Sequence, residues 1–371
     1  MNSVLGILNL YNSPELGPLS ERRAPATVSF LGRYALMDFA LSNFTNSNIN
    51  SFSILVKNNF RSVNKHVNSL KAWVNNTKIG TQNILITEKG IKDSKYNTDL
   101  NNIKENEWIL NEAKYDYAVI VPGHILTQID FHEVLDYHKA NKADITVVYS
   151  KVKNANNHYL DMDIPVFRDD SGRVYGFRQN LGTNKVEDIA LQTYIINIEL
   201  LKKMMNARTK ATSIIQTVNE LIMKDKIVCY GYFYDGFLKV FDSFEHFVEN
   251  EFALLAYEEA TRLFDHGVVT YTITHNSFPA QYGPESDVAN SYISNGSYIL
   301  GEVKNSIISR HVRVEKGASV KNSIILTGTI IGENAIIENA LIDKNVVVSA
   351  NAKVKGHKTS LEYVRKGKIV K

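Results

Sequence analysis

Short apolar runs recur along the first 240 residues or so, and each is bounded by turn-forming residues. Such runs are typical of strands buried on both faces of a sheet. The pattern predicts core strands at residues 4–8, 52–56, 84–87, 117–121 and 145–149, with two more at 190–196 and 227–232.

The segments between these runs have the periodicity of amphipathic helices. Residues 34–44, 60–73, 99–113 and 131–141 carry apolar side chains at three- and four-residue spacings. Strands that alternate with such helices predict βαβ units and a mainly parallel sheet. We therefore predict an α/β domain over residues 1–243.

Beyond two prolines, Pro279 and Pro284, the helical signal stops and a six-residue repeat begins. Its clearest column is Ile324, Ile330, Ile336, Ile342, Val348 and Val354. A hexapeptide repeat of this kind predicts a parallel β-helix, in which stacked coils share one apolar core. We place its coils at about residues 288–356, within a C-terminal domain of residues 288–371 whose basic tail, residues 358–371, caps or flanks the end.

Residues 244–264 predict a single long helix, and residues 244–287 as a whole are expected to connect the two domains. Two domains suit a chain of 371 residues, of which 44% are hydrophobic and 22% charged.

The charge balance excludes some classes of partner. Lys and Arg number 42 and Asp and Glu 39, a formal charge of only +3, which argues against nucleic acid and membrane surfaces. Cys229 is the only cysteine, so an intrachain disulfide and a cysteine-rich zinc site are excluded, and we expect a buried, inert thiol. The N-terminus lacks the cationic region of a signal peptide, and no stretch is long enough to span a bilayer. The cytoplasm is the expected location.

Residues 9–18 follow the first predicted strand, where a phosphate-binding loop is expected. They contain two prolines, one acidic residue and a single glycine, Gly17. Few backbone N–H groups can then converge on an anion, so the segment predicts a poor nucleotide site.

Residues 30–43, Phe-Leu-Gly-Arg-Tyr-Ala-Leu-Met-Asp-Phe-Ala-Leu-Ser-Asn, and residues 46–49, Asn-Ser-Asn-Ile, narrow the assignment. They closely resemble the block after the nucleotide loop in bacterial glucose-1-phosphate adenylyltransferases, and the order of elements is similar over nearly all of the chain. The resemblance implies a Rossmann-like nucleotidyltransferase domain followed by a left-handed parallel β-helix, and a role in glycogen biosynthesis. That family makes ADP-glucose from ATP and glucose 1-phosphate, with a glycine-rich loop, a lysine and two Mg²⁺-binding carboxylates.

The positions that this resemblance aligns with the family's chemistry carry other residues. Ala24 stands where the family has a lysine, and Gly123 where a metal-binding aspartate is expected. Lys239 falls at the second metal carboxylate, and Asn180 at the lysine of the sugar-phosphate block. The resemblance thus implies no catalytic residue, no metal site and no cofactor in this chain.

The resemblance then implies the non-catalytic, regulatory type of subunit, assembled with a catalytic paralogue in a hetero-oligomer, expected to be a tetramer, with self-association also possible. Some members bind phosphorylated effectors near Arg33, where Arg365 and Lys366 of the tail are candidates to approach. The alternative for these residues is ordinary surface ion pairing.

Other polar residues have a simpler interpretation. We expect His124 to be a structural loop histidine, Asp130, Asp136 and His138 to lie on a solvated helix face, and Asp161 and Asp163 to be loop charges. Two other functions stay open: an active sugar-1-phosphate nucleotidyltransferase with an atypical site, and a stand-alone effector-binding scaffold. A hexapeptide acyltransferase is disfavoured, because neither His311 nor His357 lies in a recognisable acyltransferase setting.

Overall fold

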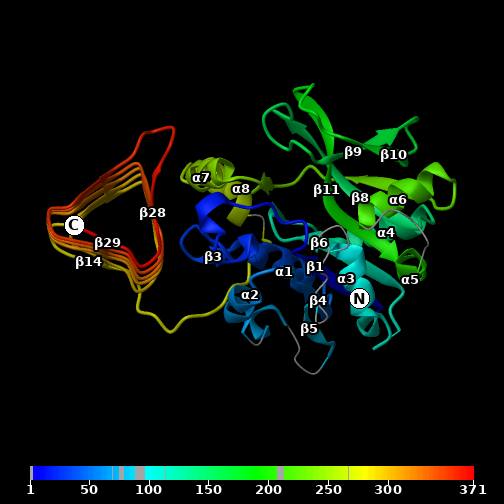
Figure 1. Ribbon diagram of the computed structural model, residues 1–371, viewed down its shortest axis with the longest axis horizontal. Coiled ribbons are helices and arrows are strands. Elements are labelled where there is room, and N and C mark those ends of the chain that lie inside the picture. The colour runs from blue at the N-terminus through cyan, green and yellow to red at the C-terminus, as the bar shows by residue number, and fades with distance from the viewer. Residues whose placement is uncertain are drawn as a thin grey trace. The chain divides into compact units, whose positions relative to one another are not determined.

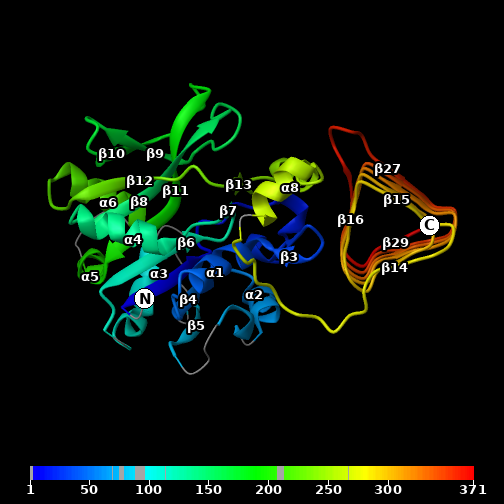
Figure 2. The ribbon, with the colours of Figure 1, turned by 180° about the vertical axis from the view of Figure 1, so that it is seen from behind.

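The computed structural model describes residues 3–68, 70–74, 79–87, 97–112, 114–206, 213–265 and 267–371. The chain divides into two compact units. One comprises Met1–Ser13 and Phe39–Val240, and the other Pro14–Asp38 and Phe241–Lys371. The break at Val240 lies near the domain boundary predicted at residue 243, but the second unit also takes in Pro14–Asp38, a segment that we had assigned to the first domain. Figures 1 and 2 show each unit from two sides.

The first unit is built on one nine-stranded sheet with the order β5-β4-β1-β6-β11-β8-β12-β10-β9. Its strands are β1 (Val4–Asn9), β4 (Ser51–Leu55), β5 (Gln82–Leu85), β6 (Tyr117–Pro122), β8 (Ile145–Lys153), β9 (Asp163–Phe167), β10 (Arg173–Gln179), β11 (Val186–Asn197) and β12 (Cys229–Phe233). All seven predicted strands are present. Strands β10 and β11 run antiparallel to their neighbours, and the other seven strands share one direction. The prediction of a mainly parallel sheet is therefore confirmed, with two antiparallel strands in it.

Both faces of the sheet are covered by helices (Figure 1), which explains its continuous apolar strands. Leu5 and Ile7 of β1 face a core that also contains residues of α3, α5 and α6. Gly6 faces the other way, where a Cβ atom would lie only 3.0 Å from the ring of Phe44 in α1. The glycine therefore lets an aromatic ring of α1 pack directly on the sheet.

The helices of this unit begin and end as follows: α1 (Leu36–Asn46), α2 (Phe60–Val67), α3 (Asp99–Glu105), α4 (Phe131–Ala140), α5 (Ile198–Asn206) and α6 (Ile214–Met223). The helix predicted at residues 60–73 is shorter than expected and is followed by a 3₁₀ turn, Lys71–Trp73; Ser69 lies outside the described residues. The helix predicted at residues 99–113 likewise gives way to a 3₁₀ turn, Glu107–Leu110, and Ala113 lies outside the described residues. Among the described residues, every helix is too short or too polar to cross a bilayer.

The single long helix predicted at residues 244–264 was wrong. The second unit has two helices there, α7 (Phe244–Ala253) and α8 (Tyr257–Phe264). Ala256 has extended backbone angles, and the Leu254 carbonyl accepts a hydrogen bond of 3.1 Å from the Tyr292 hydroxyl. In a continuous helix this carbonyl would accept from the N–H group four residues later. The break therefore lies where Tyr292 competes for a helical hydrogen bond.

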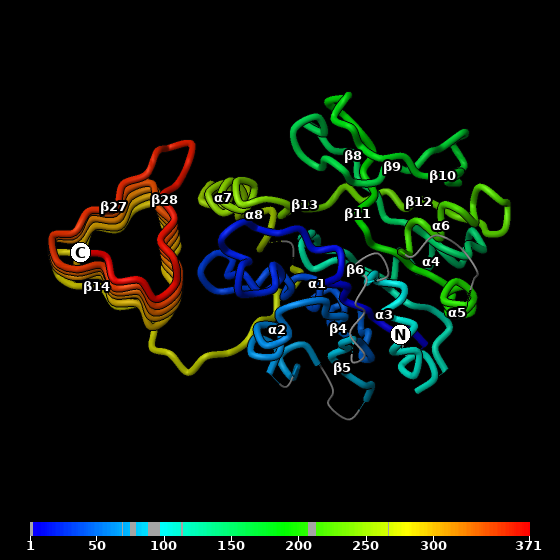
Figure 3. The backbone as a smooth tube through the Cα atoms, in the orientation of Figure 1, coloured from blue at the N-terminus to red at the C-terminus, as the bar shows by residue number. Residues whose placement is uncertain are grey.

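The rest of the second unit confirms the predicted β-helix. Three parallel sheets form its sides, and Figure 3 shows the coils as a stack. The first side consists of β14 (Gln281–Tyr282), β17 (Tyr298–Ile299), β20 (Arg313–Val314), β23 (Ile330–Ile331), β26 (Val347–Val348) and β29 (Ile369–Val370). The second consists of β15 (Asp287–Ala289), β18 (Glu302–Lys304), β21 (Ser319–Lys321), β24 (Ile336–Glu338) and β27 (Lys353–Lys355). The third consists of β16 (Tyr292–Ile293), β19 (Ile307–Ile308), β22 (Ile324–Ile325), β25 (Ala340–Ile342) and β28 (Glu362–Val364).

The limits and the phase of the repeat differ from the prediction. The coils begin at Gln281 and continue to Val370, so the basic tail supplies strands β28 and β29 rather than a cap. Ile330, which the six-residue column places in the core, is 38% exposed, whereas Ile331 is fully buried. Ile325 lies opposite Ile342, seventeen residues later, so a strict count of six drifts by one residue in each coil.

Residues 14–38 are held in the second unit by buried polar contacts. Arg23 donates hydrogen bonds to both carboxylate oxygens of Asp343, and the Tyr363 hydroxyl donates to the same carboxylate at 2.8 Å. The carboxylate of Glu251 in α7 accepts a hydrogen bond from the backbone N–H of Leu31. Arg23, Asp343 and Glu251 are all buried. The segment is therefore an integral part of the β-helix unit.

We expect Arg23→Met to destabilise the second unit by about 3–5 kcal/mol, because it leaves the Asp343 charge buried without its cation. Urea unfolding followed by far-UV circular dichroism measures the change. Arg365→Met is the matched control: its partner is Glu21, at 3.5 Å, and the Arg365 side chain is 75% exposed. The control should stay within about 0.5 kcal/mol of wild type. Equal effects of the two substitutions would contradict the importance of the buried pair.

Candidate functional site

The segment after β1 is tied down by a buried carboxylate. Asp99, at the start of α3, accepts hydrogen bonds of 3.1 Å from the side-chain amides of both Asn9 and Asn12. Its other oxygen accepts from the backbone N–H groups of Leu100 and Ile214. Burial raises the pKa of Asp99, and these four donors counteract that shift. The side-chain amides of Asn9 and Asn12 are therefore directed at the protein's own acidic group.

Two positions aligned with metal carboxylates lie close together in the first unit. Strand β7 (Ile125–Thr127) begins just after Gly123 and His124, and it pairs antiparallel with β13 (Leu238–Val240). In that pairing Lys239 lies opposite Leu126. Lys239 thus lies on one strand of a short ribbon, and Gly123 lies two residues before the other strand. These residues do not fit a Mg²⁺ ion, which prefers carboxylate oxygens.

Asn180 has a structural role in a turn. Its side chain is buried and donates to the backbone carbonyls of Ala155, at 2.8 Å, and Tyr159, at 2.9 Å. Its side-chain oxygen accepts a hydrogen bond from the N–H of Gly182. Both ends of the amide are therefore engaged within the protein, which leaves it no hydrogen for a sugar phosphate.

The carboxylate pair at residues 161 and 163 is only partly what we expected. Asp161 is exposed and accepts a hydrogen bond from Gln179. Asp163 is not a loop charge, since it begins β9 and is half-buried. Burial raises the pKa of the Asp163 carboxyl to about 6. This group therefore titrates close to neutral pH.

The group Asp130, Asp136 and His138 does not form a shared site. Asp130 caps α4 by accepting from the N–H of His132, and Asp136 is exposed. His138 was expected on a solvated face but is buried, with its ring nitrogens within hydrogen-bond distance of Thr146 and Asn197. His124 is also buried, and so is Cys229, whose thiol pKa is raised by burial as expected for an inert cysteine.

In the second unit, Arg33 lies in the turn between β2 (Ser29–Phe30) and β3 (Tyr34–Ala35), exposed to solvent. Its charge acts on Arg310, whose pKa is lowered first by burial and then by Arg33. Arg310 donates to the carbonyl of Ile273 at 3.4 Å, but its buried Nε atom has no hydrogen-bond partner among the described residues. The Asp38 carboxylate acts on the pKa of Arg310 in the opposite sense. Two guanidinium groups of like charge, one of them incompletely hydrogen-bonded, are a candidate site for an anion.

Arg365 and Lys366 follow β28 and are exposed. Arg365 pairs with Glu21, and among the described contacts it shares no partner with Arg33. Sequence reasoning missed Arg310. This residue has no distinguishing signal in the sequence, because other turns of the repeat also carry charged residues such as Lys316 and Lys344.

Ala24, at the position of the family's lysine, is buried and immediately precedes a 3₁₀ turn, Pro25–Thr27. Its carbonyl accepts hydrogen bonds from the backbone N–H and the hydroxyl of Thr27. The position has become part of a packed turn of the second unit.

Comparisons with known proteins agree with this architecture. A family model described as nucleotidyl transferase matches residues 14–179, and one described as GlmU-like, C-terminal hexapeptide matches residues 277–363. A glucose-1-phosphate adenylyltransferase of Thermotoga maritima is 29% identical over 325 residues, covering 86% of this chain and 76% of the relative. The enzyme of Thermosipho africanus is 29% identical over 327 residues, covering 86% of this chain and 78% of the relative. The enzyme of Desulfitobacterium hafniense is 26% identical over 310 residues, covering 82% of this chain and 77% of the relative.

Over most of its length, the chain is similar to glucose-1-phosphate adenylyltransferases.

Some features of the described structure agree with this similarity, and others differ from the family's chemistry. The nucleotidyltransferase sheet and the hexapeptide coils are those expected of a glucose-1-phosphate adenylyltransferase-like protein. The residues at the aligned chemical positions are a buried alanine, a glycine, a turn asparagine and a lysine on β13. The similarity therefore extends to the fold, and the activity of this chain has to be argued from its site.

We expect the stability of the first unit to depend on pH through Asp163. Folding raises its pKa from 3.8 to about 6, so the folded state binds this proton more tightly than the unfolded state does. The stability that the protonated carboxyl contributes is complete below about pH 4 and is lost as the pH rises through about 6. Asp163→Asn should match wild type at pH 4 and exceed it by up to about 3 kcal/mol at pH 7.5.

Thermal unfolding between pH 4 and pH 8 measures this difference. Asp170→Asn, on the exposed loop after β9, is the control and should leave the pH profile of wild type unchanged. An Asp163→Asn profile parallel to that of wild type would contradict the buried titration.

Proposed function

We propose that this chain is a regulatory, catalytically impaired subunit of a glucose-1-phosphate adenylyltransferase in the cytoplasm. It acts by assembling with a catalytic paralogue, in a heterotetramer, and by modulating ADP-glucose synthesis for glycogen. The main support for this proposal is the ribbon of β7 and β13. Lys239 lies opposite Leu126 there, and Gly123 lies shortly before β7.

The chemistry of the family explains why this ribbon matters. Two carboxylates hold Mg²⁺ against the phosphates of ATP, so that the negative charge of the transition state is neutralised. A lysine at one of these positions repels the ion, and a glycine at the other supplies no ligand. A single well-placed electrostatic group is worth about 3 kcal/mol of transition-state stabilisation, so two such losses lower the rate by about 10⁴-fold.

The contacts of Asp99 support the same conclusion from the ATP side. The amides of Asn9 and Asn12 are engaged by its carboxylate, and Ala24 supplies no cation. A triphosphate would meet an acidic group where the family presents N–H donors. The chain keeps the scaffold while its residues no longer stabilise the reacting charge.

A subunit of this kind acts through differential contacts. It binds the catalytic partner more tightly in one conformational state than in the other and so shifts the partner's equilibrium. Self-association of the chain is part of the same proposal.

The purified chain, given ATP, glucose 1-phosphate and Mg²⁺, should release pyrophosphate about 10⁴-fold more slowly than a catalytic paralogue from the same genome. Co-expression of the two should give a mixed oligomer by mass photometry, with altered turnover or substrate affinity. A catalytic paralogue expressed alone is the control for both measurements.

Two results would overturn this proposal. Turnover by the pure chain comparable to that of the paralogue would identify an active nucleotidyltransferase with an atypical site. A paralogue unchanged in mass and rate by the presence of this chain would favour a stand-alone effector-binding scaffold.

A phosphorylated metabolite is the effector that we propose for the mixed oligomer, bound by Arg33 together with Arg310. A phosphate dianion would relieve the repulsion between the two guanidinium groups, which supports this assignment. Arg365 and Lys366 stay in the proposal as a peripheral basic pair, because Arg365 already has Glu21 as its partner.

Arg33→Ala and Arg310→Lys should each raise the half-saturating concentration of a hexose bisphosphate in the mixed oligomer by about tenfold, since each removes a charge-assisted hydrogen bond. Arg313→Ala, an exposed arginine on β20 paired with Glu315, is the control and should leave the response unchanged. Full response in both variants would refute this assignment of the effector site.

A further inference from the structure

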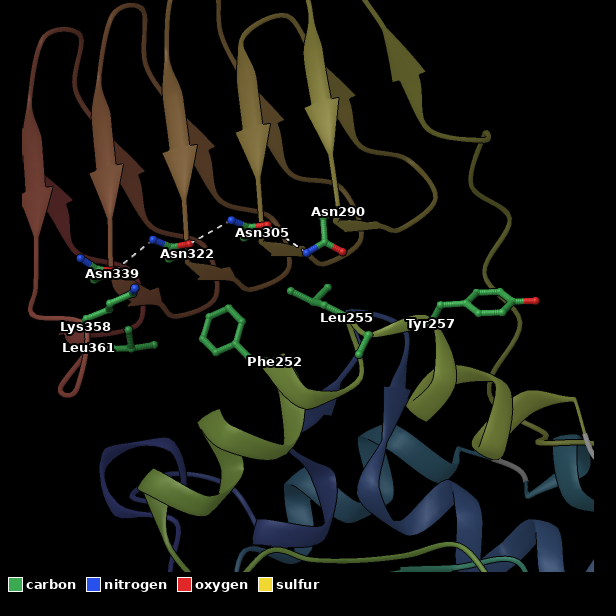
Figure 4. A pocket seen from close by; sticks show the side chains of 10 residues that line it. Phe252, Leu255, Tyr257, Asn290, Asn305, Asn322, Asn339, Lys358 and Leu361 are labelled. Atoms are coloured by element: carbon green, nitrogen blue, oxygen red, sulfur yellow. Dashed lines mark hydrogen bonds between the residues drawn. The ribbon is translucent and has the colours of Figure 1, made fainter.

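A groove of about 650 Å³ lies within the second unit, along one corner of the β-helix. Four asparagines, one from each of four successive coils, form one of its walls: Asn290, Asn305, Asn322 and Asn339. Phe252 and Leu255, at the end of α7 and just after it, face this row in Figure 4, and Lys358 and Leu361 close one end. The volume is that of a typical small-molecule site.

The asparagines form a ladder in which each amide bonds to the next coil. Asn290 donates to Asn305 at 2.9 Å, Asn305 to Asn322 at 3.4 Å, and Asn322 to Asn339 at 3.4 Å. The ladder uses one of the two amide hydrogens of each residue. The second hydrogen and a remaining lone pair of each oxygen are available to a ligand in the groove.

The spacing of these amides is fixed by the coils. Neighbouring parallel strands lie about 4.8 Å apart, so the groove presents equivalent polar groups at about that interval. Opposite them lie an aromatic ring and aliphatic side chains. The wall therefore suits a ligand with a repeating unit of similar length, polar along one edge and apolar on a ring face.

This pattern excludes several classes of ligand. A peptide along the groove advances by about 3.3 Å for each residue and falls out of step with the amides. A lipid leaves the amide groups without partners. A nucleic acid needs several cations, whereas Lys358 is the one charged residue among those that line the described groove. Linked pyranose rings meet all the requirements, because they carry hydroxyls at their edges and C–H groups on their faces.

We propose that this groove binds a neutral, linear oligosaccharide, with its hydroxyls hydrogen-bonded to the asparagine ladder and one ring stacked on Phe252. The inference is independent of the proposed regulatory role, since a catalytic and a non-catalytic chain are equally able to carry such a surface site.

Isothermal titration of the full chain with maltose, maltotriose, maltotetraose and the corresponding cello-oligosaccharides tests the proposal. Affinity should rise with chain length up to about the four steps of the ladder. Phe252→Ala should weaken binding about tenfold or more, by removal of the stacking face. Asn322→Gly should weaken it about fivefold, because glycine keeps the left-handed backbone, φ 47°, and removes only the amide.

Asn334→Gly is the matched control. Asn334 is also left-handed, with φ 56°, and lies in the same β-helix but outside the groove. Absence of binding to every oligosaccharide would overturn the proposal, as would unchanged binding by Phe252→Ala and Asn322→Gly. So would equal losses in Asn334→Gly, which would report on the coils alone. Tighter binding of a sugar phosphate, abolished by Lys358→Ala, would replace the neutral ligand by an anionic one.

Discussion

The ion pair between Arg23 and Asp343 holds an N-terminal segment of the chain, residues 14–38, in the β-helix unit. A guanidinium and a carboxylate, both buried, are stable in a protein only as partners, and Tyr363 supplies a further hydrogen bond to the same carboxylate. The segment that carries Arg23 leaves the first unit directly after the loop that follows β1, and it is fixed to a coil more than three hundred residues later in the sequence. Every residue from Pro14 to Asp38, including Ala24 and Arg33, is thereby positioned by the β-helix unit.

The strands of the fold and the polar residues at the candidate site depend on different contacts. In the first unit, the Asp99 carboxylate accepts hydrogen bonds from the amides of Asn9 and Asn12. Gly123 and Lys239 stand at positions that the sequence resemblance aligns with metal carboxylates. In the second unit, Ala24 is packed in a turn. None of these features disturbs the strands, because the sheet is held by apolar residues on both faces rather than by its polar loops. The fold therefore does not depend on which residues occupy these loop positions, so it does not by itself establish an activity.

The sequence predicted elements better than it predicted register. Seven of the nine strands of the α/β sheet followed from apolar runs, which burial on both faces requires, whereas the partly exposed β9 and β10 were not predicted. The β-helix was also evident, yet its core column was misplaced by one residue at Ile330, since a one-residue shift in a strand exchanges its two faces and Ile331 is equally apolar. The break between α7 and α8 coincides with a hydrogen bond from Tyr292, and the partner of Arg23 lies at Asp343. Contacts over such separations leave no local signal. The same holds for Arg310, whose proximity to Arg33 exists only in the folded unit.

The asparagine ladder had a sequence signal of its own, at spacings of fifteen and then seventeen residues, which a count fixed at six does not detect. Each member occupies a left-handed turn, a conformation that costs most residues about 1–2 kcal/mol and asparagine less. Seventeen residues close one coil only if a corner turns this sharply, so the backbone first explains why asparagine is there. Stacking of the coils then aligns the amides without any further requirement. A row of identical hydrogen-bonding groups at the strand spacing is thus a consequence of building a β-helix with asparagine corners. It becomes a recognition surface only where an apolar wall faces it, as Phe252 and Leu255 do here.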